Sequence, residues 1–236
     1  MPATIDTVTP STLSSHDDSG HRLPGLRWPR ALVKALHPGH VPKLKAHFLA
    51  LAGEDRYLRF GFPISDKGVV QYVERMNFER DALFGVFDDH LQLVGVAHLA
   101  AMRDDLADPA GHRPAARSAE FGVSVLPAAR GMGIGSRLFE RAIIHARNDG
   151  IEAFFMQCLT VNETMMHIAR KAGMHISIEA GEVGAWLTLP HANPGTVVAE
   201  AVEEQLAAFD LGLKKQMSSA TRWWQAATQP VTPVRR

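Results

Sequence analysis

Four residues in one short stretch, Arg130, Gly131, Gly133 and Gly135, carry the most specific chemistry in this sequence. A glycine-rich turn that opens a helix leaves several backbone N–H groups free, and they point outward at the positive end of the helix dipole. Such a turn holds a phosphate or a diphosphate. The alternative interpretation of the same glycines is a tight turn that binds nothing.

Two common phosphate-binding patterns do not fit these glycines. A P-loop ends in Gly-Lys followed by Ser or Thr, whereas the last glycine here is followed by Ser136 and Arg137. A dinucleotide-binding fingerprint needs Gly or Ala at position 136 and an acidic residue at the end of the next strand, but Glu152 precedes that strand. What remains is Arg-x-x-Gly-x-Gly after a strand, which residues 130–135 match.

The flanking residues predict a strand before the turn and a helix after it. Residues 120–126 alternate between apolar and small or polar side chains, which is the period of a half-buried strand, and Pro127 ends it. From Ser136 the apolar residues recur at helical spacing up to Gly150, which is placed as a C-terminal cap. This strand–turn–helix unit would aim the N–H groups of the turn at a ligand.

A second strand–helix unit follows. Residues 154–159 have the composition of a buried strand, and Asn162 then opens a short helical segment. Asn is a good helix N-cap, and this role is compatible with a contact to a ligand. Cys158 lies in the apolar strand, so we interpret it as a buried hydrophobic side chain rather than a nucleophile.

Together the two units resemble the cofactor-binding segment of the GNAT superfamily of N-acetyltransferases, in its bacterial form. In that superfamily the Arg-x-x-Gly-x-Gly loop binds the diphosphate of acetyl-CoA, and the Asn at the position of Asn162 often contacts the pantetheine arm or the adenosine. The resemblance implies an α/β (α+β) fold with a mixed central sheet flanked by helices. It also implies acetyl-CoA-dependent N-acetylation of a primary amine, which attacks the thioester directly.

The resemblance further implies which residues form the site. Two diverging strands, 120–126 and 154–159, would leave backbone groups for the pantetheine amides. The expected cofactor-binding residues are Val123, Val125, Leu126, Arg130, Gly131, Met132, Gly133, Ile134, Gly135, Ser136 and Asn162. Glu120 is the expected general base, acting directly or through a water, and its alternative role is an ion-paired strand end. His98 is the second candidate because its ordinary pKa is near neutrality, and its alternative role is structural. No metal site is predicted.

Ala169 departs from the family pattern. Many members carry a Tyr there, which protonates the departing thiolate, and that role cannot be carried over. A CoA thiol resembles a cysteine thiol, with a pKa of roughly 8.5, so the loss would slow the reaction rather than forbid it. The second hypothesis is therefore a non-catalytic acyl-CoA-binding or scaffold protein of the same fold, which assembles through its C-terminal helix.

The remaining patterns complete the expected fold. Helices are predicted over 41–51, closed by Gly53, and over 66–75; strands over 30–36, 83–87 and 91–99; and a closing hairpin from 174–179 and 185–189. Residues 54–60 resemble the turn between the first two helices in a bacterial GNAT group that includes domains acetylating lysines on metabolic enzymes. A protein lysine is therefore the first acceptor hypothesis, and a small amine such as a polyamine or an antibiotic is the second.

The sequence outside this core changes in character. Residues 1–26 predict a flexible arm, 27–190 the GNAT domain and 195–227 a helical extension. Residues 102–118 predict a long loop, which we interpret as a flap over the acceptor site. One cysteine and the lack of a signal peptide or a long apolar run favour a reducing, cytoplasmic location. With 25 basic and 25 acidic side chains, composition favours neither nucleic acid nor a membrane surface as a partner.

The C-terminal extension has one apolar stripe. Its members are Val198, Val202, Leu206, Phe209, Leu213, Met217, Ala220 and Trp224. This spacing predicts one face of a long helix, and the glutamates near its start and basic residues near its end suit the helix dipole. Because such a face must be covered, we expect it to pack on the core or on a second subunit in a homodimer. The polar face is too poor in Lys and Arg to favour a membrane.

Overall fold

The computed structural model describes residues 31–102 and 117–227. Its strands are β1 Lys34–Ala35, β2 Ala82–Phe87, β3 Leu93–Ala101, β4 Ser118–Val125, β5 Ala153–Leu159, β6 His175–Glu179 and β7 Glu182–Thr188. Its α-helices are α1 Val41–Leu49, α2 Gly53–Phe60, α3 Asp66–Glu74, α4 Ile134–Asn148, α5 Glu163–Lys171 and α6 Pro194–Ala227. The predicted arm 1–26 and most of the predicted flap 102–118 lie outside the described residues.

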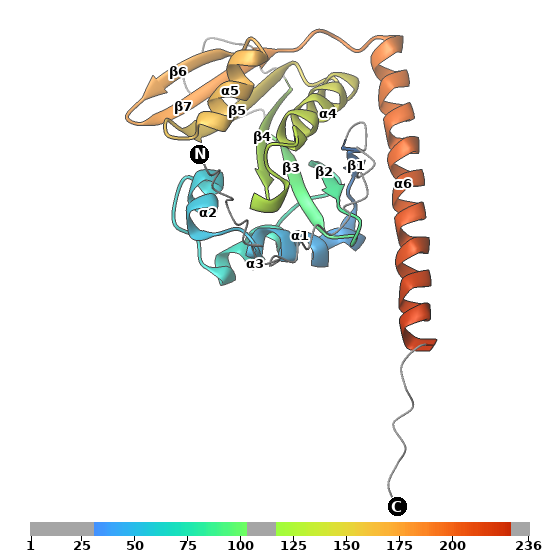
Figure 1. Cartoon of the computed structure of the whole chain (residues 1–236). Coiled ribbons are helices and arrows are strands. Elements are labelled where there is room, and N and C mark those ends of the chain that lie inside the picture. The colour runs from blue at the N-terminus through green and yellow to red at the C-terminus, as the bar shows by residue number, and fades with distance from the viewer. Residues whose placement is uncertain (1–30, 103–116, 228–236) are drawn as a thin grey trace, which may run out of the picture.

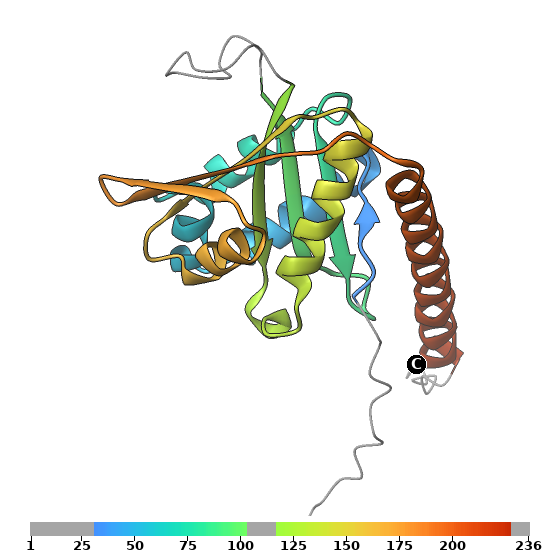
Figure 2. The same ribbon diagram turned by 90° about the horizontal axis from the view of Figure 1, so that it is seen from above.

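One mixed sheet, in the order β1-β2-β3-β4-β5-β7-β6, forms the middle layer (Figure 1). Helices α1, α2 and α3 lie on one face of it, and α4 and α5 lie on the other (Figure 2). Each face has its own apolar core. Leu44, Phe48, Val69 and Val73 fill the first, and Phe121, Leu138, Phe139, Phe154 and Ala169 belong to the second.

The strands β4 and β5 diverge in the centre of the sheet. They pair in parallel only at the start, and the last paired residues are Glu120 and Phe155. Beyond that point β4 continues to Val125 along β3, while β5 continues to Leu159 along β7. Because each strand keeps its outer partner, the inner backbone edges are left open to each other from Phe121 onward.

The two predicted strand–helix units are confirmed. Helix α4 begins at Ile134, two residues before the predicted start, because Gly133 adopts a left-handed conformation with φ +75° and turns the chain into the helix. Gly150 follows its end with φ +73°. Asn162 caps α5 as predicted, since its side-chain oxygen accepts a hydrogen bond from the Met165 N–H at 3.2 Å.

The prediction of a turn over residues 54–60 is wrong, because this segment is helix α2. Gly53 is the first residue of α2 and does not close α1. The Arg56 side chain explains the difference: its guanidinium donates to the carbonyl oxygens of Leu49 and Leu51, which lie at the end of α1. Helix α1 therefore ends without a glycine cap. The hairpin was also predicted too short, because β7 begins at Glu182.

Helix α6 stands alongside β1 and α4 at the edge of the sheet (Figures 1 and 2). Its predicted apolar stripe does not pack on the core: Val198 is 60% exposed and Phe209 75% exposed. The side that faces the domain buries Ala207 and Leu211 and carries the glutamates, which pair with basic residues of α4. Within the described ranges, no helix is both long enough and apolar enough to cross a membrane.

Candidate active site

A cavity of about 580 Å³ occupies the opening between β4 and α5. Its walls come from α2, the end of β4, the loop that leads into α4, and α5. Nine of the predicted cofactor-binding residues line it: Val123, Val125, Arg130, Gly131, Gly133, Ile134, Gly135, Ser136 and Asn162. The structure therefore gathers most of the predicted set around one space.

Leu126 and Met132 do not line this cavity. The Leu126 N–H donates to the Val94 carbonyl oxygen at 2.8 Å, so it faces β3 and is not open to a ligand. Backbone groups alternate in direction along a strand, so those of Val123 and Val125 face the opening instead. The Met132 side chain is 70% exposed and points away from the protein.

The loop before α4 offers free N–H groups to the cavity. Gly131 and Gly133 have φ near +75°, and a Cβ at either would meet no atom within 4 Å. No side chain caps the start of α4, and its first turn closes with the bond from the Arg137 N–H to the Gly133 carbonyl at 3.1 Å. The preceding N–H groups are left for an anion, which the positive end of the helix favours. A diphosphate fits this arrangement.

Arg130 is held at the edge of the loop by two partners. Its guanidinium lies 2.5 Å from the Asp55 carboxylate of α2, and its Nε donates to the Val125 carbonyl oxygen at 3.2 Å. Asp55 also lines the cavity and was not predicted from the sequence. Asp55 therefore orients Arg130, the arginine of the motif, and its carboxylate competes with a diphosphate for the guanidinium.

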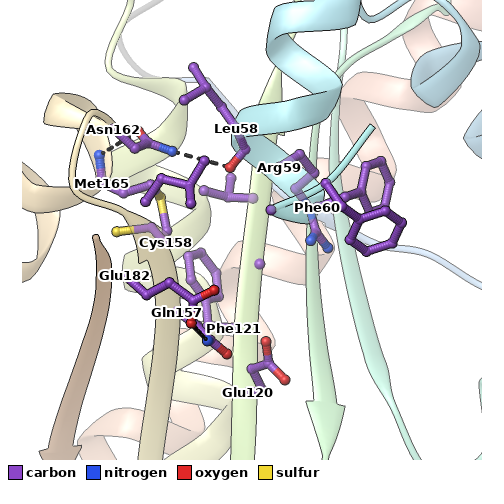
Figure 3. A pocket seen from close by; sticks show the side chains of 15 residues that line it. Leu58, Arg59, Phe60, Glu120, Phe121, Gln157, Cys158, Asn162, Met165 and Glu182 are labelled. Carbon is purple, nitrogen blue, oxygen red and sulfur yellow. Dashed lines mark hydrogen bonds between the residues drawn. The ribbon is translucent and has the colours of Figure 1, made fainter. Parts of the chain in front are cut away.

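A second cavity, of about 250 Å³, adjoins the first and contains the predicted base (Figure 3). Leu58, Arg59, Val123, Asn162 and Met165 line both cavities. The smaller one adds Phe60, Gly61, Phe62, Glu120, Phe121, Gly122, Gln157, Cys158, Leu159 and Glu182. Glu120 is exposed and lines this cavity. A reactant bound in the cavity can therefore reach the Glu120 carboxylate. It can also reach the end of an extended ligand that lies between β4 and β5.

His98 lines neither cavity. It is buried, with one ring nitrogen 2.9 Å from the Tyr72 hydroxyl and the other 3.2 Å from Asp81. Burial by itself would raise the pKa of the Asp81 carboxyl, but hydrogen bonds from His98, Arg80 and the Ala101 N–H outweigh it and lower that pKa. His98 therefore belongs to a buried polar chain and is not placed to touch a substrate in either cavity.

Two predictions about α5 and β5 can be compared with the structure. Cys158 is buried, as predicted, and burial raises the pKa of its thiol. Ala169 is fully buried in the apolar core, so its position does not face the cavity. The polar side chains that α5 contributes to the lining are Thr164 and His167, which the sequence pattern did not single out.

Comparisons with known proteins agree with this geometry. The sequence profile of the Acetyltransferase (GNAT) family matches residues 53–174, about half of the chain. The GNAT domain of S. lividans PAT is 23% identical, with a TM-score of 0.54 over 66% of this chain and 89% of that chain. An N-acetyltransferase from Staphylococcus aureus Mu50 is 16% identical, with a TM-score of 0.51 over 67% of this chain and 98% of that chain. The chain belongs to the GNAT family of acetyltransferases, which use acetyl-CoA as the acyl donor.

Proposed function

We propose that this protein N-acetylates a primary amine, with acetyl-CoA between β4 and α5 and the amine in the smaller cavity. One observation carries the proposal: the stretch of β4 after Glu120, which no longer pairs with β5, lines both cavities and leads directly into the glycine loop. A single strand thereby connects an anion-binding loop to an exposed carboxylate. Holding two reactants in such register supplies several kcal/mol toward the reaction.

Each part of the site has a role in this proposal. The N–H groups of residues 131–136 hold the diphosphate, and the inward backbone groups of Val123 and Val125 pair with the pantetheine amides. Asn162 fixes the wall opposite β4, because its side-chain N–H₂ donates to the Leu58 carbonyl oxygen at 3.4 Å while its oxygen caps α5. The thioester supplies the acetyl group, and Glu120 takes the proton of the attacking amine, directly or through a water.

The first acceptor we propose is a lysine side chain of a protein, and the second is a small amine. The former rests on the resemblance of residues 54–60 to lysine-acetylating domains. The smaller cavity supports an amine of either kind, because the Glu120 and Glu182 carboxylates line it and attract an ammonium group.

Release of free CoA thiol from acetyl-CoA, followed with lysine peptides, polyamines and aminoglycosides, tests the activity. We expect turnover with at least one class, and Glu120→Gln should lower it most at low pH, where the amine needs help losing its proton. Glu182→Gln is the matched control for loss of charge in the same cavity: Glu182 accepts a hydrogen bond from Gln157 at 2.9 Å, so the variant should weaken amine binding without changing the pH dependence of kcat. Equal activity of Glu120→Gln and wild type across pH would remove Glu120 from the mechanism.

The second candidate function, acyl-CoA binding without catalysis, is favoured by Ala169. An alanine offers no hydroxyl at the position where many relatives carry the Tyr acid. This function predicts tight CoA binding with no thiol release from any amine in the panel.

We also propose that residues 195–227 form an assembly element, separate from a catalytic unit of residues 27–190, and that two copies pair through α6. All acidic side chains between Pro194 and Leu213 make ion pairs on the inner side of the helix. The outer side carries Val198, Val202, Leu206, Phe209 and Leu213, each between 41% and 75% exposed. A face depleted of charge and rich in large apolar groups is typical of the centre of an interface, in which each partner contributes about 800 Å².

A further inference from the structure

Arg59 lies at the junction of the two cavities, and among the residues 31–102 and 117–227 it has no counter-charge. It descends from α2 toward β4, with Glu120 further along the same strand (Figure 3). In the part of the chain that the structure describes, no carboxylate lies within ion-pair distance of its guanidinium, and its buried Nε has no hydrogen-bond partner. Arg59 is partly buried, and a cation whose Nε is buried without a partner is costly unless a ligand supplies the missing acceptor and negative charge.

A chain of hydrogen bonds holds this guanidinium in one orientation. Its Nη2 donates to the Tyr72 hydroxyl oxygen at 2.8 Å. Because that oxygen accepts from Arg59, its own proton is available for the facing nitrogen of His98, whose other ring N–H then points at Asp81. The Phe60 and Tyr72 rings flank the cation, with centroids 5.2 and 5.7 Å from Cζ. This gives the buried chain through His98 a positioning role.

The backbone of β4 leaves space for the guanidinium. A Cβ added at Gly122 would lie 2.5 Å from Cζ and Nη2 of Arg59, so only glycine allows the approach. Gly122 is two residues after Glu120 and therefore on the same face of the strand. The cation thus lies beside the carboxylate that serves as base in the proposed function, in the same small cavity.

We propose that Arg59 binds a carboxylate group carried by one of the two reactants. This rests on the proposed function and deepens it, because it adds a charge requirement to the substrate class. A guanidinium is the side chain best suited to a carboxylate, which it can bind through two parallel N–H groups. The group has two sources: an acceptor that carries both an amine and a carboxylate, such as an amino acid, or a dicarboxylic acyl group on the CoA donor.

Isosteric pairs distinguish the two sources. For the acceptor, 4-aminobutanoate is compared with 4-aminobutanamide, using acetyl-CoA. For the donor, succinyl-CoA is compared with 4-methylpentanoyl-CoA, whose branched end replaces the carboxylate by an apolar group of the same shape. In one of these pairs we expect kcat/KM to favour the carboxylate in the wild type. Arg59→Met should reduce that preference about tenfold or more, since a charge-assisted hydrogen bond is worth at least that ratio.

Several variants separate binding from general damage. Arg59→Lys keeps the charge but loses the two-pronged geometry, so it should retain part of the preference. Tyr72→Phe keeps Arg59 but removes its hydrogen-bond partner, so the carboxylate preference should fall between those of wild type and Arg59→Met. This variant also tests the inference if Arg59→Met does not fold. Arg75→Met removes an exposed arginine at the end of α3 and should change neither ratio.

Calorimetric binding of the same pairs, to the protein alone for donors and to the CoA complex for acceptors, gives a readout independent of turnover. A carboxylate preference in binding that Arg59→Met abolishes, in a protein that releases no thiol, would support the inference while the proposed function fails. Turnover with no carboxylate preference in either pair would overturn the inference alone. An equal loss of kcat/KM for both members of each pair in Arg59→Met would also overturn it, because Arg59 would then stabilise a charge that both compounds share.

Discussion

At the scale of single residues, His47 shows how the scaffold supports β4 next to the site. The residue is 2% exposed, and each ring nitrogen has a hydrogen-bond partner. Its Nδ1–H donates to the Leu93 carbonyl oxygen at 2.8 Å, so its Nε2 accepts from the Ser124 hydroxyl, also at 2.8 Å. Burial lowers the pKa of His47 to about 4, and the Arg59 charge adds to this effect although the Leu93 hydrogen bond opposes it. The imidazole is therefore neutral at physiological pH.

The neutral state of His47 predicts how stability depends on pH. The unfolded chain takes up a proton near pH 6.5 but the folded chain only near 4, so the free energy of unfolding falls as the pH decreases through this window, by up to about 3 kcal/mol. Urea unfolding at pH 7.5, 5.5 and 4.5 measures the effect. His47→Gln should show a shallower decrease, while His191→Gln, an exposed control, should follow the wild type. Parallel curves for His47→Gln and wild type would contradict the assignment.

We expect alanine at two glycines of residues 130–135 to change the stability of the fold in opposite directions. Gly133 has φ +75°, where a Cβ costs about 1–2 kcal/mol, so Gly133→Ala should destabilise the fold and weaken CoA binding. Gly135 lies inside α4 and a Cβ there would meet only Ile168, at an ordinary 3.7 Å. Gly135→Ala should therefore keep or raise stability, by up to about 1 kcal/mol. Chemical unfolding and CoA titration of both variants test this contrast, and equal destabilisation would show that backbone strain is not the cause.

At the scale of elements, α6 is attached to the domain by charges on α4. Glu200 accepts hydrogen bonds at 2.7 Å from both Arg141 and His145, and Asn148 is a third partner. Burial alone would raise the pKa of Glu200, but these bonds prevail and lower it to about 2. Glu203 differs: burial raises its pKa despite an ion pair with Arg137 at 2.7 Å. The ionised Glu200 carboxylate therefore stabilises the docked helix, whereas the ionised Glu203 carboxylate destabilises it.

This difference predicts that Glu200→Gln and Glu203→Gln are not equivalent. Glu200 stabilises the folded state above pH 4.5, and this contribution is lost as the pH falls from about 4.5 toward 2. Glu200→Gln should lower the thermal midpoint at pH 7, and its difference from wild type should shrink through pH 3 and become small only near pH 2. Glu203→Gln should leave the midpoint at pH 7 unchanged or raise it. A larger loss in Glu203→Gln would mean that its ion pair, and not its burial, dominates.

The elements also show how far the sequence predicted this fold and site. The strand–helix units of residues 118–171 were predicted because periodicity, caps and glycines are local signals, and the family resemblance of these units led to nine residues that line the larger cavity. Helix α2 was missed because it is only eight residues long and none of its residues is fully buried, so its sequence carries no long apolar stripe. Arg59 was missed with it, since only tertiary structure brings α2 to Gly122. The orientation of α6 was missed because its partners, Arg137 and Arg141, were not recognised as a basic surface of α4.

At the scale of the whole molecule, the family match ends at residue 174 and leaves α6 outside it. The helix contacts the domain mainly through ion pairs and through the buried residues Ala207 and Leu211. Its apolar side and the two cavities lie on different elements, because no residue of α6 lines either cavity. In the proposed dimer, pairing through α6 links two sites without covering them, so assembly and catalysis should separate in variants.

The double variant Leu206→Glu/Phe209→Glu tests this separation. Both side chains are more than half exposed, so the glutamates are tolerated in a monomer but bring like charges together in a pair. Light scattering coupled to size exclusion should give a dimer mass for the wild type and a monomer mass for the variant, with CoA affinity equal in both. Gln71→Glu, an exposed change on α3, should remain dimeric. A wild-type chain that is monomeric at all concentrations tested rules out pairing, whereas a variant that loses CoA binding together with the dimer shows that α6 supports the site after all.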